Sequence, residues 1–155
     1  MQEWLVDGYN LLNARPRGES PKSKRNVGVL LAQLAGFASA NGNRMLVVLD
    51  GAGDPAELDI HHTALFLVVY SQNVSADACI ERLLFERRGQ AEFTVVTNDR
   101  AIANIARGAG AVVMASEAFL EMLKGSQKDR LDTLDKRDAR SHGFNRPFDE
   151  KLKDL

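Results

Sequence analysis

Short apolar runs alternate along the chain with segments whose apolar residues recur at three- and four-residue spacing. The runs predict strands at Glu3–Asp7, Met45–Leu49, Leu65–Tyr70, Phe93–Thr97 and Ala111–Met114. The periodic segments predict helices at about 23–40, 75–88, 100–107 and 117–124. A fully apolar run such as 45–49 is typical of a strand covered on both faces. Repeated strand–helix alternation therefore favours an α/β three-layer sandwich with a mainly parallel central sheet.

Apolar residues large enough to build a core are concentrated in the first four-fifths of the chain. With 155 residues in all, one domain is expected, and we place it at residues 1–125. From Ser126 onward both charge signs are frequent and large apolar residues are rare, so this segment contributes little core. We interpret residues 126–155 as a charged C-terminal tail.

Charge and cysteine content narrow the class of protein. The formal net charge of −1 lacks the strongly basic signature of many nucleic-acid-binding proteins. A single cysteine, Cys79, excludes a disulfide within the chain and a zinc site built from several thiolates. No apolar run approaches the ~20 residues that span a bilayer, and Met1-Gln2-Glu3-Trp4 does not resemble the start of a secretory signal. We expect a cytoplasmic protein with no membrane partner.

Acidic residues follow three of the predicted strands, at Asp7, Asp50 and Asp99. Because parallel strands share one carboxyl edge, where ligands bind, these side chains should converge there. Asp77 and Glu81 lie four residues apart on a predicted helix and are therefore neighbours on one face. Convergent carboxylates repel one another, and a hard cation such as Mg²⁺ or Mn²⁺ neutralises them. The pattern predicts metal-assisted chemistry.

Some of these residues also fit purely structural roles. Gly8 permits a tight turn that brings Asn10 to the same mouth as Asp7, where Asn10 either orients a phosphate or metal-bound water or forms an Asx turn. Asp99 or Asn98 is a candidate helix cap. Asp77 suits the positive end of its helix dipole.

Local charge differs from the global balance. Five basic residues lie close together after the first predicted strand, opposed only by Glu19: Arg15, Arg17, Lys22, Lys24 and Arg25. A basic loop beside an acidic metal site can hold phosphates, although such a loop is equally well explained as solvated surface.

Four motifs in order resemble the YacP-like NYN family, a branch of the PIN-type ribonuclease superfamily. They are Leu5-Val6-Asp7-Gly8-Tyr9-Asn10, Val47-Val48-Leu49-Asp50, Ser75-Ala76-Asp77 with Glu81, and Thr97-Asn98-Asp99. Together they span most of residues 3 to 124, and the tail falls outside the resemblance. The resemblance implies a PIN-like fold and an Mg²⁺- or Mn²⁺-dependent endoribonuclease whose products carry a 5′-phosphate and a 3′-hydroxyl. Some relatives act on messenger RNA at the ribosome.

The resemblance also implies roles for individual residues. Asp7, Asp77 and Asp99 would be the principal metal ligands, directly or through water, and Asp50 and Glu81 are further candidates. Asn10 would position the scissile phosphate, so that the catalytic set is Asp7, Asn10, Asp77 and Asp99. Arg25 and Arg100 would neutralise neighbouring phosphates. Because the chain is not strongly basic, the ribosome or another RNA–protein assembly is a candidate for presenting the RNA.

Two other functions fit part of the sequence. A PIN-like module that binds RNA or the ribosome without cutting would keep the fold and the metal. A phosphohydrolase of the haloacid-dehalogenase type also uses an aspartate after its first strand, but Tyr9 stands where its second aspartate belongs. Nucleotide-binding glycine motifs are incomplete, because Gly51 and Gly53 have no third glycine and no Gly-Lys-Ser/Thr loop is present.

Overall fold

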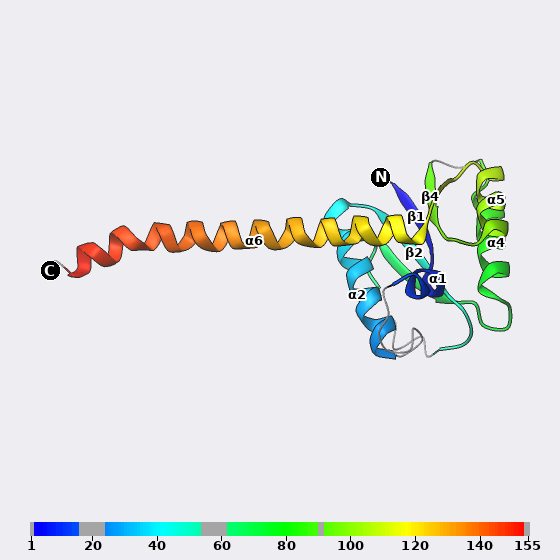
Figure 1. Cartoon of the computed structure of the whole chain (residues 1–155), viewed down its shortest axis with the longest axis horizontal. Helices are drawn as coiled ribbons and strands as arrows, with labels where there is room; N and C mark the ends of the chain where they lie inside the picture. The colour runs from blue at the N-terminus through cyan, green and yellow to red at the C-terminus, as the bar shows by residue number, and fades with distance from the viewer. Residues whose placement is uncertain (1, 16–23, 54–61, 90–91, 154–155) are drawn as a thin grey trace. The chain divides into compact units, whose positions relative to one another are not determined.

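A five-stranded, all-parallel sheet organises the Met1–Leu123 part of the chain (Figure 1). The computed structural model describes residues 2–15, 24–53, 62–89 and 92–153, and it leaves aside the side chains of 24–25 and 140–153. The strands are β1 (Glu3–Asp7), β2 (Arg44–Leu49), β3 (Phe66–Tyr70), β4 (Phe93–Val96) and β5 (Val112–Met114). Their order is β3-β2-β1-β4-β5, which confirms the predicted parallel α/β architecture.

The register of the strands brings the acidic strand ends to one edge. β1 is central, with Asp7 opposite Val48 of β2 and Val6 opposite Val96 of β4. Asp50 and Asp99 each follow shortly after the end of their strand. All three aspartates therefore leave the sheet at its carboxyl edge, as their spacing predicts.

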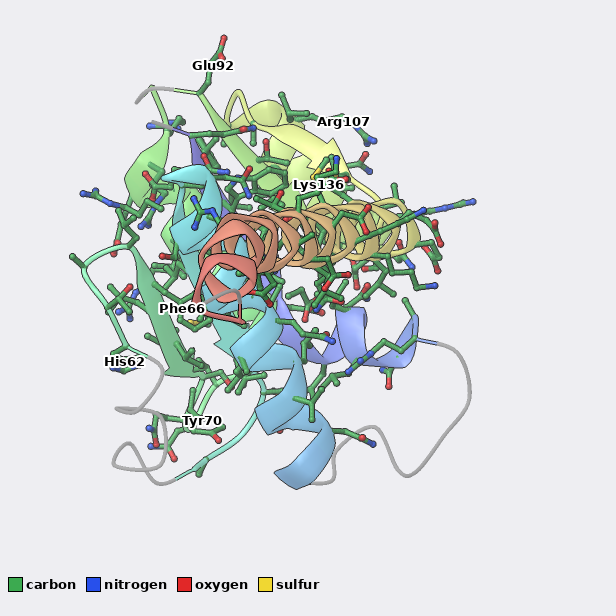
Figure 2. The ribbon with its side chains drawn as sticks, turned by 90° about the vertical axis from the view of Figure 1, so that its left-hand side faces the viewer. His62, Phe66, Tyr70, Glu92, Arg107 and Lys136 are labelled. Carbon is green, nitrogen blue, oxygen red and sulfur yellow. The ribbon has the colours of Figure 1, made fainter. Side chains whose placement is uncertain are left out.

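Helices cover both faces of the sheet and complete the three layers. One face packs against α1 (Gly8–Asn13), α2 (Lys24–Asn41) and the start of α6 (Ser116–Lys153). On this face, ring contacts join β1, α2 and α6 through Trp4, Phe37 and Phe119, with ring centroids 5.2 to 5.8 Å apart. The other face packs against α4 (Ala76–Arg87) and α5 (Arg100–Gly108), which contribute Ile80 and Ile102 to a second core. Figure 2 labels Phe66 and Tyr70 at the two ends of β3.

Gly8 lies where the tight turn was predicted, and it also has a packing role. It is the first residue of α1, a short helix that the sequence pattern did not predict. A Cβ atom on Gly8 would lie 2.5 Å from Leu49 Cδ2 and 3.0 Å from the Val48 carbonyl oxygen. Glycine is needed here because α1 begins directly after β1 and in close contact with β2, where a Cβ atom would clash.

The last helix is longer than the predicted 117–124. Contacts divide the chain between Leu123 and Lys124, close to the predicted boundary at residue 125, but α6 continues across this division to Lys153. The tail was predicted only from the scarcity of residues that can form a core. Residues after 124 are nevertheless rich in Lys and Arg, which favour helix without any core to pack against.

Two predictions fall on residues without a description. Most of the basic loop lies at 16–23, and the side chains of Lys24 and Arg25 are also outside the described residues.

Within the described part of the chain, none of the helices combines the length and apolar character that crossing a membrane requires.

Candidate active site

Asp7 is the most buried carboxylate of the predicted set. It ends β1 at the centre of the sheet, and only 7% of its surface is exposed. Burial raises the pKa of Asp7 to about 6, because a charge removed from water is penalised. The backbone amide of Asn10 lowers this pKa in part, while the charges of Asp77, Asp99 and Asp50 raise it further. Asp7 is therefore held in a site that favours either a proton or a cation.

Asp50 is exposed and is held by hydrogen bonds at the N-terminus of α4. The backbone N–H of Ala76 donates to Asp50 Oδ1 (3.0 Å), and the Ser71 hydroxyl donates to the same oxygen (3.4 Å). Ser71 Oγ in turn accepts the backbone N–H of Gly51 (3.0 Å). Asp50 thus joins the end of β2 to the segment between β3 and α4, a structural role that the sequence analysis did not assign to it.

Asp77 and Glu81 lie one turn apart on α4, as predicted. Ser75 caps this helix by accepting the Ala78 N–H at 3.1 Å, so Asp77 is not needed as the cap. Partial burial raises the pKa of Asp77, and the charges of Asp99, Glu81 and Asp50 add to the effect. Both side chains are exposed. The charge of Asp77 acts on Asp7, and the charge of Glu81 acts on Asp77.

Asp99 has the structural role that the sequence analysis left open. Its Oδ1 accepts the Ile102 N–H at 3.0 Å, which makes it the N-cap of α5. A carboxylate that caps a helix through one oxygen can still bind a cation through the other. The charge of Asp99 also reaches both Asp7 and Asp77, because it raises the pKa of each.

Asn10 does not form the Asx turn considered from the sequence. Its Oδ1 accepts the backbone N–H of Asn98 (2.9 Å) and the Ser116 hydroxyl (2.8 Å). Asn98 Oδ1 accepts the Ser116 N–H (2.9 Å), and Asn98 Nδ2 donates to both carboxylate oxygens of Glu117. This network fixes the loop that carries Asp99 against α1 and the start of α6.

Sequence analysis missed Ser116 and Glu117 as members of this network. They lie 106 and 19 residues from their respective partners Asn10 and Asn98, so no local spacing connects them. Asn98 carried a signal, because it directly precedes Asp99 after a strand, but we considered it only as a cap of the next helix.

A second polar feature adjoins Asp99. A cleft of about 550 Å³ lies beside the 97–98 loop, α5 and β5, and its charged lining residues are Arg100 and Arg107. Asn98 and Asn104 add polar groups to the same cleft. Arg107 is exposed on α5 (Figure 2). Arg100 was predicted to contact phosphates, whereas Arg107 and Asn104 were missed because nothing in the sequence relates them to the acidic strand ends.

We call Asp7, Asp50, Asp77, Glu81 and Asp99 the acidic group. Their carboxylate oxygens are the kind of donor atom that a hard divalent cation prefers. The members of the group are oxygen ligands of like charge at one edge of the sheet. Burial is the largest cause of the raised pKa values of Asp7 and Asp77, and repulsion from the neighbouring carboxylates adds to it. Among the described residues, however, no three His, Cys, Asp or Glu side chains are already arranged around one metal position. Joint binding would require exposed side chains such as Asp77 to turn.

Comparison with known proteins gives one family and one fold. The model for the YacP-like NYN domain matches residues 4–154. The match extends through the C-terminal segment, so the expectation that residues 126–155 fall outside the family resemblance was wrong. Comparison with curated proteins gives no match.

Solved structures of Rae1 (YacP) from Bacillus subtilis have the same fold. The W164L mutant is 25% identical with a TM-score of 0.73, over 90% of this chain and 85% of that one. A second Rae1 (YacP) structure is 24% identical with a TM-score of 0.75, over 98% of this chain and 90% of that one. The PIN-like three-layer fold is thereby confirmed.

Proposed function

The chain belongs to the YacP-like NYN domain family, which is a family of PIN-like nucleases, and on this basis we propose that it is a divalent-metal-dependent endoribonuclease. One observation carries the proposal. Asp7 is a buried carboxyl group with a pKa near 6, and the charges of three further aspartates reach it at the carboxyl edge of the sheet. Such an environment is costly for folding and is suited to a bound cation.

Asp7, Asp77 and Asp99 would hold Mg²⁺ or Mn²⁺, with Asp50 and Glu81 as outer members of the site. The metal, when bound, lowers the pKa of a water molecule and stabilises negative charge on the scissile phosphate. A carboxylate of the group takes the proton of the attacking water. The oxygen of this water would bond to phosphorus while the bond from phosphorus to the 3′-oxygen breaks. The leaving 3′-oxygen would take up a proton from solvent, so that the products carry a 5′-phosphate and a 3′-hydroxyl.

Substrate positioning is assigned to the groups next to Asp99. Asn10 and Asn98 fix the loop that carries Asp99, and Asn10 would in addition position the scissile phosphate. Arg100 would neutralise a neighbouring phosphate, together with Arg107, which lines the same cleft. Arg25 remains part of the proposal from its sequence position alone.

RNA is the proposed substrate, and a ribosome is the proposed means of presenting it. The net charge of −1 gives little long-range attraction for a polyanion, so an assembly that holds messenger RNA would compensate for weak affinity. A cytoplasmic location follows from this substrate.

The test is cleavage of naked RNA and of ribosome-bound messenger RNA by the wild-type chain and by Asp7→Asn, with Mn²⁺ or with chelator. We expect internal cuts by the wild type with Mn²⁺ and none by the variant or with chelator. Cutting only on ribosomes would assign substrate presentation to the ribosome. Absence of Asp7-dependent cutting on both substrates would sink the nuclease proposal.

A non-catalytic binding module and a phosphohydrolase would each give a different result, when binding and a phosphomonoester substrate are tested beside RNA cleavage. A binding module associates with RNA or ribosomes whether or not Asp7 is present, and it leaves the RNA intact. A phosphohydrolase releases phosphate from a phosphomonoester and spares the RNA chain.

A further inference from the structure

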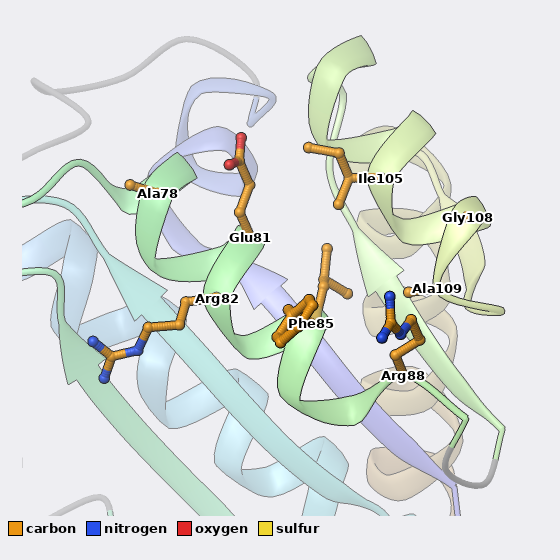
Figure 3. A pocket seen from close by; sticks show the side chains of 9 residues that line it. Ala78, Glu81, Arg82, Phe85, Arg88, Ile105, Gly108 and Ala109 are labelled. Carbon is orange, nitrogen blue, oxygen red and sulfur yellow. The ribbon is translucent and has the colours of Figure 1, made fainter.

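A groove separates α4 from α5 on the face of the sheet that these helices cover (Figure 3). Its volume is about 520 Å³, within the range of sites that bind small organic ligands. Leu84 is fully buried beneath it, and the more exposed apolar side chains are Phe85 from α4 and Ile105 from α5. Glu81, Arg82 and Arg88 are its charged lining residues. The groove therefore joins a small apolar surface to a rim with two arginines.

Phe85 has the exposure expected of a stacking platform. Its side chain is 67% exposed, the largest exposed fraction among the large apolar residues described. The guanidinium carbon of Arg88 lies 4.8 Å from the centre of the Phe85 ring, which holds the ring by a cation–π contact. Planar nucleobases stack on such exposed rings, and stacking does not depend on base identity.

The groove is continuous with the acidic group through α4. Asp77, Glu81 and Phe85 follow one another at four-residue spacing on the same face of the helix, and Glu81 is both a neighbour of Asp77 and a lining residue of the groove. At 1.5 Å per residue, Phe85 lies about 12 Å along the axis from Asp77. A strand bound at the acidic group therefore reaches the groove within a short length of RNA.

Charge favours a nucleic acid over an apolar peptide as the occupant. Arg82 is contacted by Glu86 at 3.7 Å, whereas Arg88 stacks on Phe85 and can meet a phosphate with its N–H groups. We propose that this groove binds one nucleobase of single-stranded RNA, stacked on Phe85, with Arg88 at the adjoining phosphate. The inference rests on the proposed ribonuclease function and extends it to a substrate-binding subsite outside the acidic group.

The test measures binding separately from cleavage. The full chain carrying Asp7→Asn is titrated against a short fluorescent single-stranded RNA, alone and with Phe85→Ala added. We expect Phe85→Ala to weaken binding about tenfold, as loss of one stacked base does. Phe85→Trp should restore binding, and Phe85→Leu, which keeps an apolar side chain without a ring, should not. Leu67→Ala is the matched control, because Leu67 is 50% exposed on β3 and outside the groove.

A set of RNAs, each lacking the base of one nucleotide at a different position, identifies the base that contacts Phe85. At one position, loss of the base should weaken binding to the Asp7→Asn protein by the same factor, and Phe85→Ala should then cause no further loss. Unchanged binding after Phe85→Ala, an equal Phe85→Ala effect with every abasic RNA, or no RNA binding by any variant would each overturn the proposal.

Wild-type cleavage distinguishes failure of the subsite from failure of the function. If RNA is cut and Phe85→Ala alters neither KM nor binding, the nuclease stands and the subsite is wrong. If RNA is not cut but binding depends on Phe85 and on one base, the subsite stands and the nuclease proposal is wrong.

Discussion

β1 and β2 are neighbouring apolar strands that each lead to an aspartate at the same edge, yet Asp7 and Asp50 lie in opposite environments. Asp7 is buried, and the environment raises its pKa to about 6. Asp50 is exposed and accepts the Ala76 N–H and the Ser71 hydroxyl. Asp50 is thus exposed and has two hydrogen-bond donors, whereas the charge on Asp7 is buried and only partly compensated by the Asn10 amide.

This difference separates a carboxylate that supports the fold from one that is costly for it. A buried charge with three like charges nearby opposes folding, so its position is explained better by what it binds than by what it stabilises. The position of Asp50 is explained by its hydrogen bonds at the N-terminus of α4, without any ligand. The two aspartates should therefore respond differently to the same substitution.

The largest expected difference is in RNA cleavage. Asp7→Asn should reduce cleavage by at least about 100-fold, because a metal contributes several kcal/mol to transition-state stabilisation and loses a principal ligand. Asp50→Asn should keep cleavage within a few-fold of wild type, because an amide oxygen still accepts the Ala76 N–H. Initial rates with Mn²⁺ measure both, and circular dichroism checks that both variants fold. Equal losses would show that Asp50 is a ligand of the same rank as Asp7.

Sequence alone predicted the parallel sheet, its strand ends and the acidic edge, because strand-length apolar runs followed by aspartate depend only on local pattern and chain topology. It did not predict α1, because a six-residue helix that begins at a glycine has too short a pattern to detect. Nor did it distinguish Asp7 from Asp50. Their environments depend on partners such as Ser71, Ala76 and Asp99, which only the folded chain brings close.

A smaller effect, on stability, should have the opposite sign. The pKa of Asp7 is higher in the folded chain than its ordinary value of 3.8, so the folded state gains stability when Asp7 is protonated. That stability is present below about pH 4 and is lost as the pH rises through about 6. With chelator present, Asp7→Asn should raise the free energy of unfolding at pH 8 by about 2 to 3 kcal/mol and leave it nearly unchanged at pH 4.

Urea unfolding at both pH values measures this change, and Asp50→Asn serves as the control. A stabilisation by Asp7→Asn that is equally large at pH 4 and pH 8 would contradict the titration argument. Added Mn²⁺ should reverse the order of the two proteins at pH 8, since only wild type gains from binding the ion through Asp7.

The smallest expected effect concerns the structural role of Asp50. Asp50→Ala removes the acceptor for the Ala76 N–H at the start of α4, and loss of such a helix-terminal acceptor costs about 1 kcal/mol. Asp50→Asn keeps an oxygen acceptor and should cost less. Urea unfolding at pH 7 with chelator compares the two variants with wild type. If the alanine variant is instead as stable as wild type, the hydrogen bond to Ala76 does not explain the conformation at the end of β2, and Asp50 joins Asp7 as a residue placed there for a ligand.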